Sequence, residues 1–279
     1  MSSGAILHHL LFAACVATAT FTQSLTGFAF GLVLLGLVAV FHLAPLPVAA
    51  NVVTVMVLAN AALLVRTMPA LPRRLLAPSY GSSLVGVAIG ACLLAWLSDN
   101  AIGVVRFALG LAILACSLLL VVQTKPRAQL ASPGTFAFYG CISGVMGGVF
   151  ASAGPPMVFH LYRQPLDRVV VRDTLVLLFA VNAVLRLIIV LAQGRFDAAS
   201  LALSAEALPV VLTVTWLARR YPPNWSPTAV RRVVFVLLAI AGMSLVAPAI
   251  TSASASTNAS ARAHGKVSVA SLQHRIFTA

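Results

Sequence analysis

Residues 143–156 read SGVMGGVFASAGPP, and this stretch interrupts an apolar segment that runs from 134 to 162. The segment is too long for one relaxed membrane span of about 20 residues, and its glycines and prolines break the helical pattern. A second interrupted segment runs from 6 to 41 and carries QSLTGFAFG at residues 23–31. The two stretches decide the fold, because each predicts a broken helix or a hairpin in place of a simple span.

The composition around these stretches is that of a membrane protein. Hydrophobic residues make up 61% of the 279 positions and charged residues only 8%, with a mean hydropathy of +1.02. A soluble domain is about one quarter charged, so a globular surface cannot be built from this chain. We therefore predict an all-α integral membrane protein with about eight to ten transmembrane segments. The start lacks the basic region of a signal peptide, so we expect it to belong to the first span.

The net charge of +13 does not indicate nucleic acid. Twelve of the 18 Lys and Arg lie in four short segments between apolar runs, without the interleaved aromatics of a nucleic-acid surface. The four cysteines form no CxxC pair or Cys/His cluster, so no metal site is predicted, and no cofactor motif is found. The expected partners are a small anion and membrane lipid, and homo-oligomer formation is left open.

Each interrupted segment is followed by three simple apolar segments. We therefore predict a first membrane repeat at 1–122, a cytoplasmic linker at 123–133, a second membrane repeat at 134–250 and a disordered polar tail at 251–279. The simple segments are 47–65, 76–97 and 101–122 in the first half, and 174–192, 199–217 and 231–250 in the second.

The orientation of the halves follows from the basic loops at 66–74, 125–127, 163–172 and 219–232. Positive charge in short loops stays on the cytoplasmic side. All four loops can be cytoplasmic only if the segment 134–162 enters and leaves on the same side. By the repeat, the segment 6–41 is then also a hairpin, and the two halves have opposite orientations. Inverted repeats with broken helices bind their substrate near the midplane, where the breaks meet.

Arg186 lies in the middle of an apolar run, with no acidic residue near it in sequence. A mid-membrane arginine costs about 2.5–3.5 kcal/mol on insertion scales, and its planar fork suits two oxygens of an anion. The alternative is a structural contact with a backbone carbonyl or with Glu206, which is also a candidate for proton coupling. Asn51, Asn60 and Asn182 are candidates for the same cavity or for hydrogen bonds between helices.

Glycines at the breaks can turn backbone N–H groups and helix N-termini toward an anion. For Gly86 and Gly90 we expect close helix packing instead, because small residues four apart let two backbones approach.

At these motifs the sequence resembles the TauE/SafE family of sulfite exporters. The resemblance rests on residues 23–31, on GSSLVGVAIG at 81–90 and on the second break, and it covers nearly the whole chain except the tail. It implies transport of sulfite, sulfonates or related organic anions, and it marks Arg172 as the arginine that opens the helix after the second break. The residues that we predict to bind substrate are Gln23, Thr26, Gly27, Phe28, Gly31, Asn51, Gly144, Gly147, Gly148, Ser152, Gly154, Pro155 and Arg186.

The sequence thus predicts a secondary transporter of a small anion in the bacterial inner membrane and not an enzyme. The alternative within transport is uptake of thiosulfate or another reduced sulfur species, with Cys141 beside the second motif as a thiol contact. An intramembrane lipid-modifying enzyme is a weaker alternative, because no histidine has a carboxylate near it in sequence.

Overall fold

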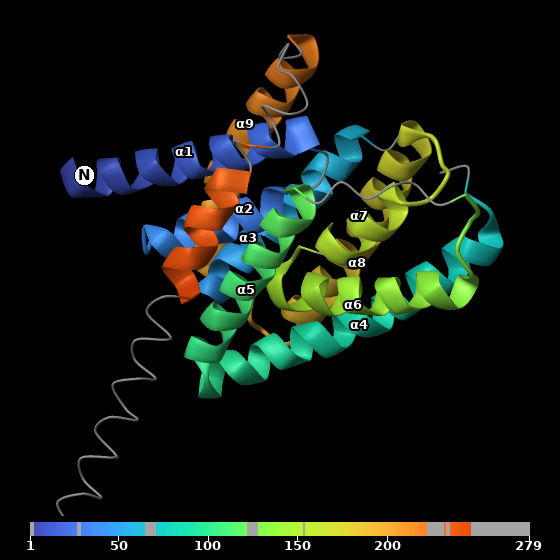
Figure 1. The fold of residues 1–279 in the computed structure, drawn as a ribbon. Helices are drawn as coiled ribbons and strands as arrows, with labels where there is room; N and C mark the ends of the chain where they lie inside the picture. Colours follow the sequence, from blue (N-terminus) through green and yellow to red (C-terminus); the bar gives the residue numbers. More distant parts are fainter. Residues whose placement is uncertain are drawn as a thin grey trace, which may run out of the picture.

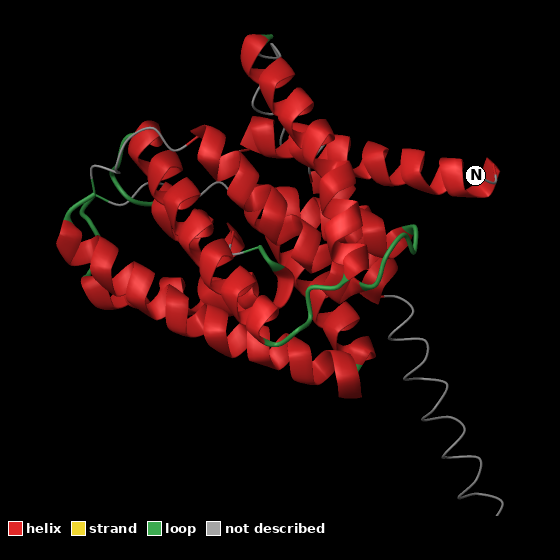
Figure 2. Ribbon diagram, turned by 180° about the vertical axis from the view of Figure 1, so that it is seen from behind, coloured by secondary structure: helices red, strands yellow, loops and turns green. Residues whose placement is uncertain are grey.

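The computed structural model describes residues 3–26, 29–64, 71–121, 128–152, 154–221, 232 and 235–246. Every regular element in these ranges is a helix, which confirms the predicted all-α class for this part of the chain (Figure 2). The elements are α1 (Ser3–Thr26), α2 (Phe30–Val40), α3 (Leu46–Leu64), α4 (Arg73–Asn100), α5 (Ile102–Val121), α6 (Pro133–Phe150), α7 (Gly154–Tyr162), α8 (Arg168–Ala192) and α9 (Ala198–Arg220). A further apolar helix spans Phe235–Val246.

Four of the described helices are long and apolar enough to cross a membrane, namely Gly4–Ser24, Arg73–Asn100, Val169–Ala192 and Ala198–Ala218. Four shorter apolar helices accompany them, and the predicted number of spans stays a prediction. The predicted tail at 251–279 and the first part of the linker, 123–127, lie outside the described residues.

Both interrupted segments are broken into two helices. α1 ends at Thr26 and α2 begins at Phe30, whereas α6 ends at Phe150 and α7 begins at Gly154. The second break has a clear local cause. Ala151 adopts the left-handed region with φ of 52°, and Pro155 and Pro156 lack the N–H groups that a continuous helix would need. Prolines fit the first turn of α7, where those N–H groups have no partner within the helix.

Each broken segment returns to the end from which it started. Near the start of α1, His8 Nε2 donates to the carbonyl oxygen of Leu43, just beyond α2, at 3.0 Å. Just before α6, the backbone N–H of Ala131 donates to Gln164 Oε1, just beyond α7, at 2.9 Å. The two segments are therefore hairpins whose ends are tied by hydrogen bonds.

The two hairpins open toward opposite ends of the bundle. Asp99 at the end of α4 pairs with Arg195 between α8 and α9, and the carbonyl oxygen of Arg195 accepts from Asn51, which follows the first hairpin. We call this the Asp99 end. At the other end, which we call the Leu71 end, an apolar cluster joins the starts of α4, α6 and α8 to α7; it includes Leu71, Leu75, Phe136, Leu161 and Val171.

α4 and α6 lie side by side along their lengths in both views (Figures 1 and 2). Glycines on both helices bring the two backbones into contact. A Cβ atom on Gly86 would lie 2.4 Å from the carbonyl oxygen of Cys141, and one on Gly90 would lie 2.3 Å from that of Val145. The packing role predicted for Gly86 and Gly90 is therefore confirmed. On α6, Gly144 faces Ser83 in the same way, at 2.1 Å from its carbonyl oxygen.

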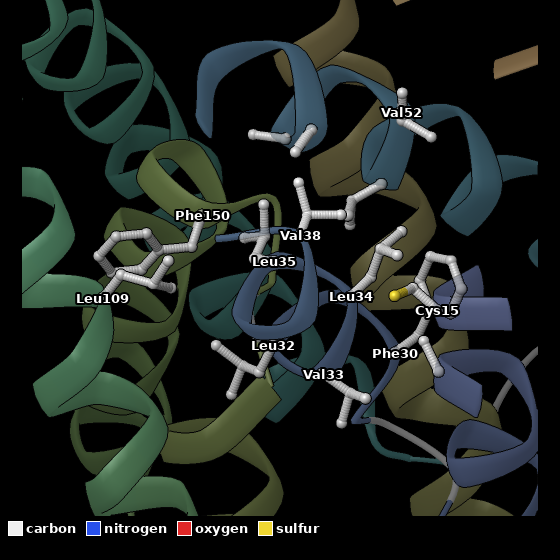
Figure 3. Close-up of a cluster of buried hydrophobic side chains, with 14 of the residues drawn as sticks. Cys15, Phe30, Leu32, Val33, Leu34, Leu35, Val38, Val52, Leu109 and Phe150 are labelled. Atoms are coloured by element: carbon white, nitrogen blue, oxygen red, sulfur yellow. The ribbon is translucent and has the colours of Figure 1, made fainter. Parts of the chain in front are cut away.

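The main apolar core surrounds the short helix α2, as Figure 3 shows for Leu32, Leu34 and Val38. Eight of the eleven α2 residues are buried, as expected for a helix that is apolar on all sides. Cys15, Leu109 and Phe150 pack around it from α1, α5 and α6. This packing fixes the N-terminus of α2 deep inside the bundle.

We expect Gly144→Ala to lower the thermal unfolding midpoint of the detergent-solubilised protein, because its methyl group would meet the backbone of α4. Overpacking of this kind costs typically about 1–3 kcal/mol. Gly81→Ala on α4 is the matched control, because a Cβ atom there meets nothing within 4 Å. Alanine is the better helix former, so the control midpoint should stay or rise. Equal midpoints for the two variants would contradict the packing account.

Candidate functional site

The two breaks meet in the middle of the bundle. Gly31, in the first turn of α2, lies so close to Ser152 in the second break that a Cβ atom on Gly31 would approach Ser152 Cβ to 2.9 Å. α2 and α7 both begin at this point, so two helix N-termini are brought to one place, although Pro155 and Pro156 leave α7 with fewer free N–H groups than α2. Such N-termini carry partial positive charge and favour anions.

A small pocket, partly open to the surroundings, lies at this meeting point. Its walls come from α1, α2, α3, α6, α7 and α8 and from the second break. None of the described residues that line it is acidic; they are Gln23, Phe30, Gly31, Thr54, Val57, Gly147, Ala151, Ser152, Gly154, Phe179, Asn182, Ala183 and Arg186.

Arg186 on α8 is the charged residue of this wall, and only 2% of its surface is exposed. Its Nε donates to the carbonyl oxygen of Gly148 at 3.0 Å, which ties α8 to the end of α6. Its Nη1 donates to Thr54 Oγ1 at 2.6 Å, and to Asn51 Oδ1 and the carbonyl oxygen of Ala50 at 3.3 Å each. The guanidinium therefore joins α3, α6 and α8 at the level of the breaks.

All four acceptors of Arg186 are neutral groups. A guanidinium stays protonated in proteins, and burying a charge without an opposite charge is costly even when its donors are satisfied. Within the described ranges, Nη2 donates no hydrogen bond and no carboxylate lies within ion-pair distance of Arg186. The charge and two N–H donors are thus left for a ligand with negatively charged oxygens.

The alternative role predicted for Arg186 is a structural contact, either with a backbone carbonyl or with Glu206. The structure contains the first of these contacts. The side chain does contact backbone carbonyls, at Gly148 and Ala50. Glu206, the other proposed partner, lies away from the pocket and accepts a hydrogen bond from His9 Nδ1 at 2.8 Å. Its role in proton coupling stays a prediction.

Asn51 and Thr54 stand one turn apart on α3, so both side chains reach Arg186 from the same face of that helix. Asn51 is held by two further bonds, from its Nδ2 to the carbonyl oxygen of Arg195 and to Ser200 Oγ. Thr54 Oγ1 accepts from Arg186 and donates to the carbonyl oxygen of Ala50. The position of the guanidinium is therefore fixed by side chains that are themselves held in place.

A second polar chain ends at Gln23 on α1. Asn60 Nδ2 donates to Gln23 Oε1 at 2.9 Å, and Thr215 Oγ1 donates to Asn60 Oδ1 at 3.1 Å. Because the Gln23 oxygen is occupied, its amide NH₂ group is the part that remains for the pocket. Asn182 bonds Ser83 on α4, so all three asparagines on the simple spans make hydrogen bonds between helices.

The pocket brings together six of the residues predicted to bind substrate, namely Gln23, Gly31, Gly147, Ser152, Gly154 and Arg186. Asn51 is not among the lining residues, but its Oδ1 accepts a hydrogen bond from Arg186. Gly144 and Gly148 point their α-carbons at α4, where a ligand has no room, and Gly148 contributes its carbonyl oxygen to Arg186. Gly27, Phe28 and the side chains of Thr26 and Pro155 lie outside the described residues.

Sequence reasoning did not assign Phe30, Thr54, Val57, Phe179 and Ala183 to the site, although all five line the pocket. A signal for Thr54 was present, because it follows Asn51 by three residues and shares its helix face. The apolar residues gave no such signal, since nothing in an apolar run marks the side chain that faces a cavity.

Comparison with known proteins identifies the family of this chain. The sequence model described as "Sulfite exporter TauE/SafE" matches residues 11–245. The chain belongs to this family. A curated relative from Cupriavidus necator, named "Probable sulfite/organosulfonate exporter TauE", is 36% identical over 239 residues, which cover 85% of this chain and 93% of the relative. No solved structure matches the chain.

Membership in this transporter family, together with four long apolar helices, makes the chain a multi-pass membrane protein. The family resemblance expected from the sequence motifs is thereby confirmed.

Thr54→Val should destabilise the protein through loss of a hydrogen bond to a buried charge, which is worth about 1.5–3 kcal/mol. The matched control is Thr20→Val, because buried Thr20 donates only to a carbonyl oxygen of its own helix, at 2.7 Å. Chemical denaturation in detergent compares the two variants. A control that loses as much stability as Thr54→Val would argue against a special role for the Arg186 contact.

Proposed function

We propose that the protein is a secondary transporter that exports a small anion, such as sulfite or an organosulfonate, across the bacterial inner membrane. The observation that carries the proposal is Arg186, a buried guanidinium whose described partners are all neutral, set at the meeting point of two broken helices. Membership in the sulfite exporter family and the name of the relative from Cupriavidus necator support the same class of substrate.

The pocket offers an anion several donors at once. Arg186 supplies a guanidinium edge, Gln23 an amide NH₂ group and Ser152 a hydroxyl, and the N-termini of α2 and α7 add backbone dipoles. Such donors hold an oxyanion without a metal or a covalent bond. A permease needs binding of this reversible kind, because the substrate must leave on the other side.

The inverted-repeat plan is part of the proposal. It is supported by two tied hairpins that open toward opposite ends, each at the start of one half of the chain. Arg73 and Arg74 begin α4, Arg172 lies in the first turns of α8 and Arg163 directly follows α7. These elements meet at the Leu71 end, so the positive-inside rule makes that end cytoplasmic. Alternating access would then expose the midplane pocket to each side in turn by movement of one repeat against the other.

The energy source would be the proton gradient or the membrane potential. Glu206 remains the candidate for proton coupling, and its hydrogen bond with His9 links α9 to α1. Uptake of thiosulfate is not favoured. The relative is named an exporter, and Cys141 is not among the described residues of the pocket wall.

Radiolabelled sulfite flux in proteoliposomes tests the proposal. The wild-type protein should carry sulfite, and Arg186→Gln should abolish the flux while the protein still inserts, because the charge that attracts the anion is gone. Arg106→Gln is the matched control, since Arg106 is exposed on α5 and does not line the pocket. Normal flux in Arg186→Gln would refute the anchor role. Absence of wild-type flux with sulfite, sulfonates and small carboxylates would refute the transporter.

A further inference from the structure

The described side chains of the pocket wall carry a single formal positive charge, to which the N-termini of α2 and α7 add only partial charge. Arg186 supplies the formal charge, and the other twelve lining residues are neutral and have no group that titrates near neutral pH. The groups that touch the guanidinium, namely Gly148, Ala50, Asn51 and Thr54, add no charge of either sign. A ligand with one negative charge therefore neutralises the charge of the site, whereas a ligand with two negative charges exceeds it.

Three side chains of the wall keep hydrogen-bond donors available. Nη2 of Arg186, Nε2 of Gln23 and the hydroxyl of Ser152 donate to none of the described residues. The orientation of the Gln23 amide is fixed, because its Oε1 accepts from Asn60 Nδ2 and Asn60 Oδ1 in turn accepts from Thr215 Oγ1. The wall thus presents at least these three side-chain donor groups and a single cation.

Most of the other side chains that line the pocket are apolar. Phe30, Val57, Phe179 and Ala183 line the pocket from α2, α3 and α8. These side chains offer no hydrogen bond to a charged oxygen, and they keep the local dielectric constant low. A charge left over after binding would therefore stay poorly solvated.

We propose that the site selects monovalent anions of the form R–SO₃⁻, namely hydrogensulfite or a small organosulfonate, and discriminates against the dianions sulfite and sulfate. The proposal rests on the proposed function and adds the charge state of the substrate to it. A monoanion beside Arg186 makes a neutral pair, whereas the second negative charge of a dianion is opposed only by the partial charges of the helix N-termini and by no second cation. The three oxygens of R–SO₃⁻ match the three donor groups, and the apolar wall accommodates R.

The binding of methanesulfonate and of sulfate to the purified wild-type protein, compared by calorimetry at equal ionic strength, tests this inference. Methanesulfonate should bind at least about tenfold more tightly, because a tenfold ratio corresponds to only 1.4 kcal/mol of discrimination. Sulfite should bind more tightly as the pH falls and hydrogensulfite replaces the dianion. Methanesulfonate keeps its single charge over the same pH range and reports any titration of the protein itself.

A designed change of the pocket charge gives a second, independent test. Gln23→Lys adds a cation to the wall and should shift the ratio of affinities toward sulfate by about tenfold or more, because a dianion is then balanced. Gln23→Leu, which removes the amide without adding charge, should weaken both anions and leave the preference for methanesulfonate.

The outcomes separate this inference from the proposed function. Sulfate binding as tight as methanesulfonate binding in the wild-type protein would overturn charge selection and leave an anion transporter standing. An unchanged ratio in Gln23→Lys, with both anions still bound, would also overturn it. Failure of every anion to bind the wild-type protein would overturn both proposals.

Discussion

The buried guanidinium of Arg186 is the interaction on which the arrangement of the bundle centre depends. It joins the end of α6 through Gly148 and the face of α3 through Thr54 and Asn51, and it stands on α8. Each partner is neutral, so these bonds position the charge without cancelling it. A helix that must bury a charge in this way constrains its neighbours, because loss of the Gly148 carbonyl contact would leave the Nε–H group without an acceptor in apolar surroundings.

Two close backbone contacts make that arrangement possible. Glycines let α4 and α6 touch along their lengths, and this pair then acts as a rigid wall against which α8 packs. The absence of a side chain on Gly31 lets the start of α2 approach Ser152 in the second break. Without that approach the two helix N-termini could not share one pocket. Small residues therefore serve the site indirectly, by controlling how closely its walls come together.

Much of this organisation can be predicted from the sequence, because glycine and proline act locally. The two breaks, the hairpins and Arg186 follow from residues that interrupt an apolar pattern. The direction in which each glycine faces does not follow from the sequence. Gly144, which the motif predicts at the substrate, faces Ser83 on α4. Phe179 and Ala183 were missed because a pocket wall made of apolar residues looks like any other span. Such assignments depend on the rotation of a helix about its axis, which tertiary packing decides.

The central claim is that an anion occupies the free edge of Arg186. An experimental structure of the protein with methanesulfonate bound tests it most directly. Our account predicts the sulfonate oxygens within hydrogen-bond distance of Arg186 Nη2, with further contacts to Gln23 and Ser152. A sulfonate bound elsewhere in the protein, with no anion beside Arg186, would contradict it.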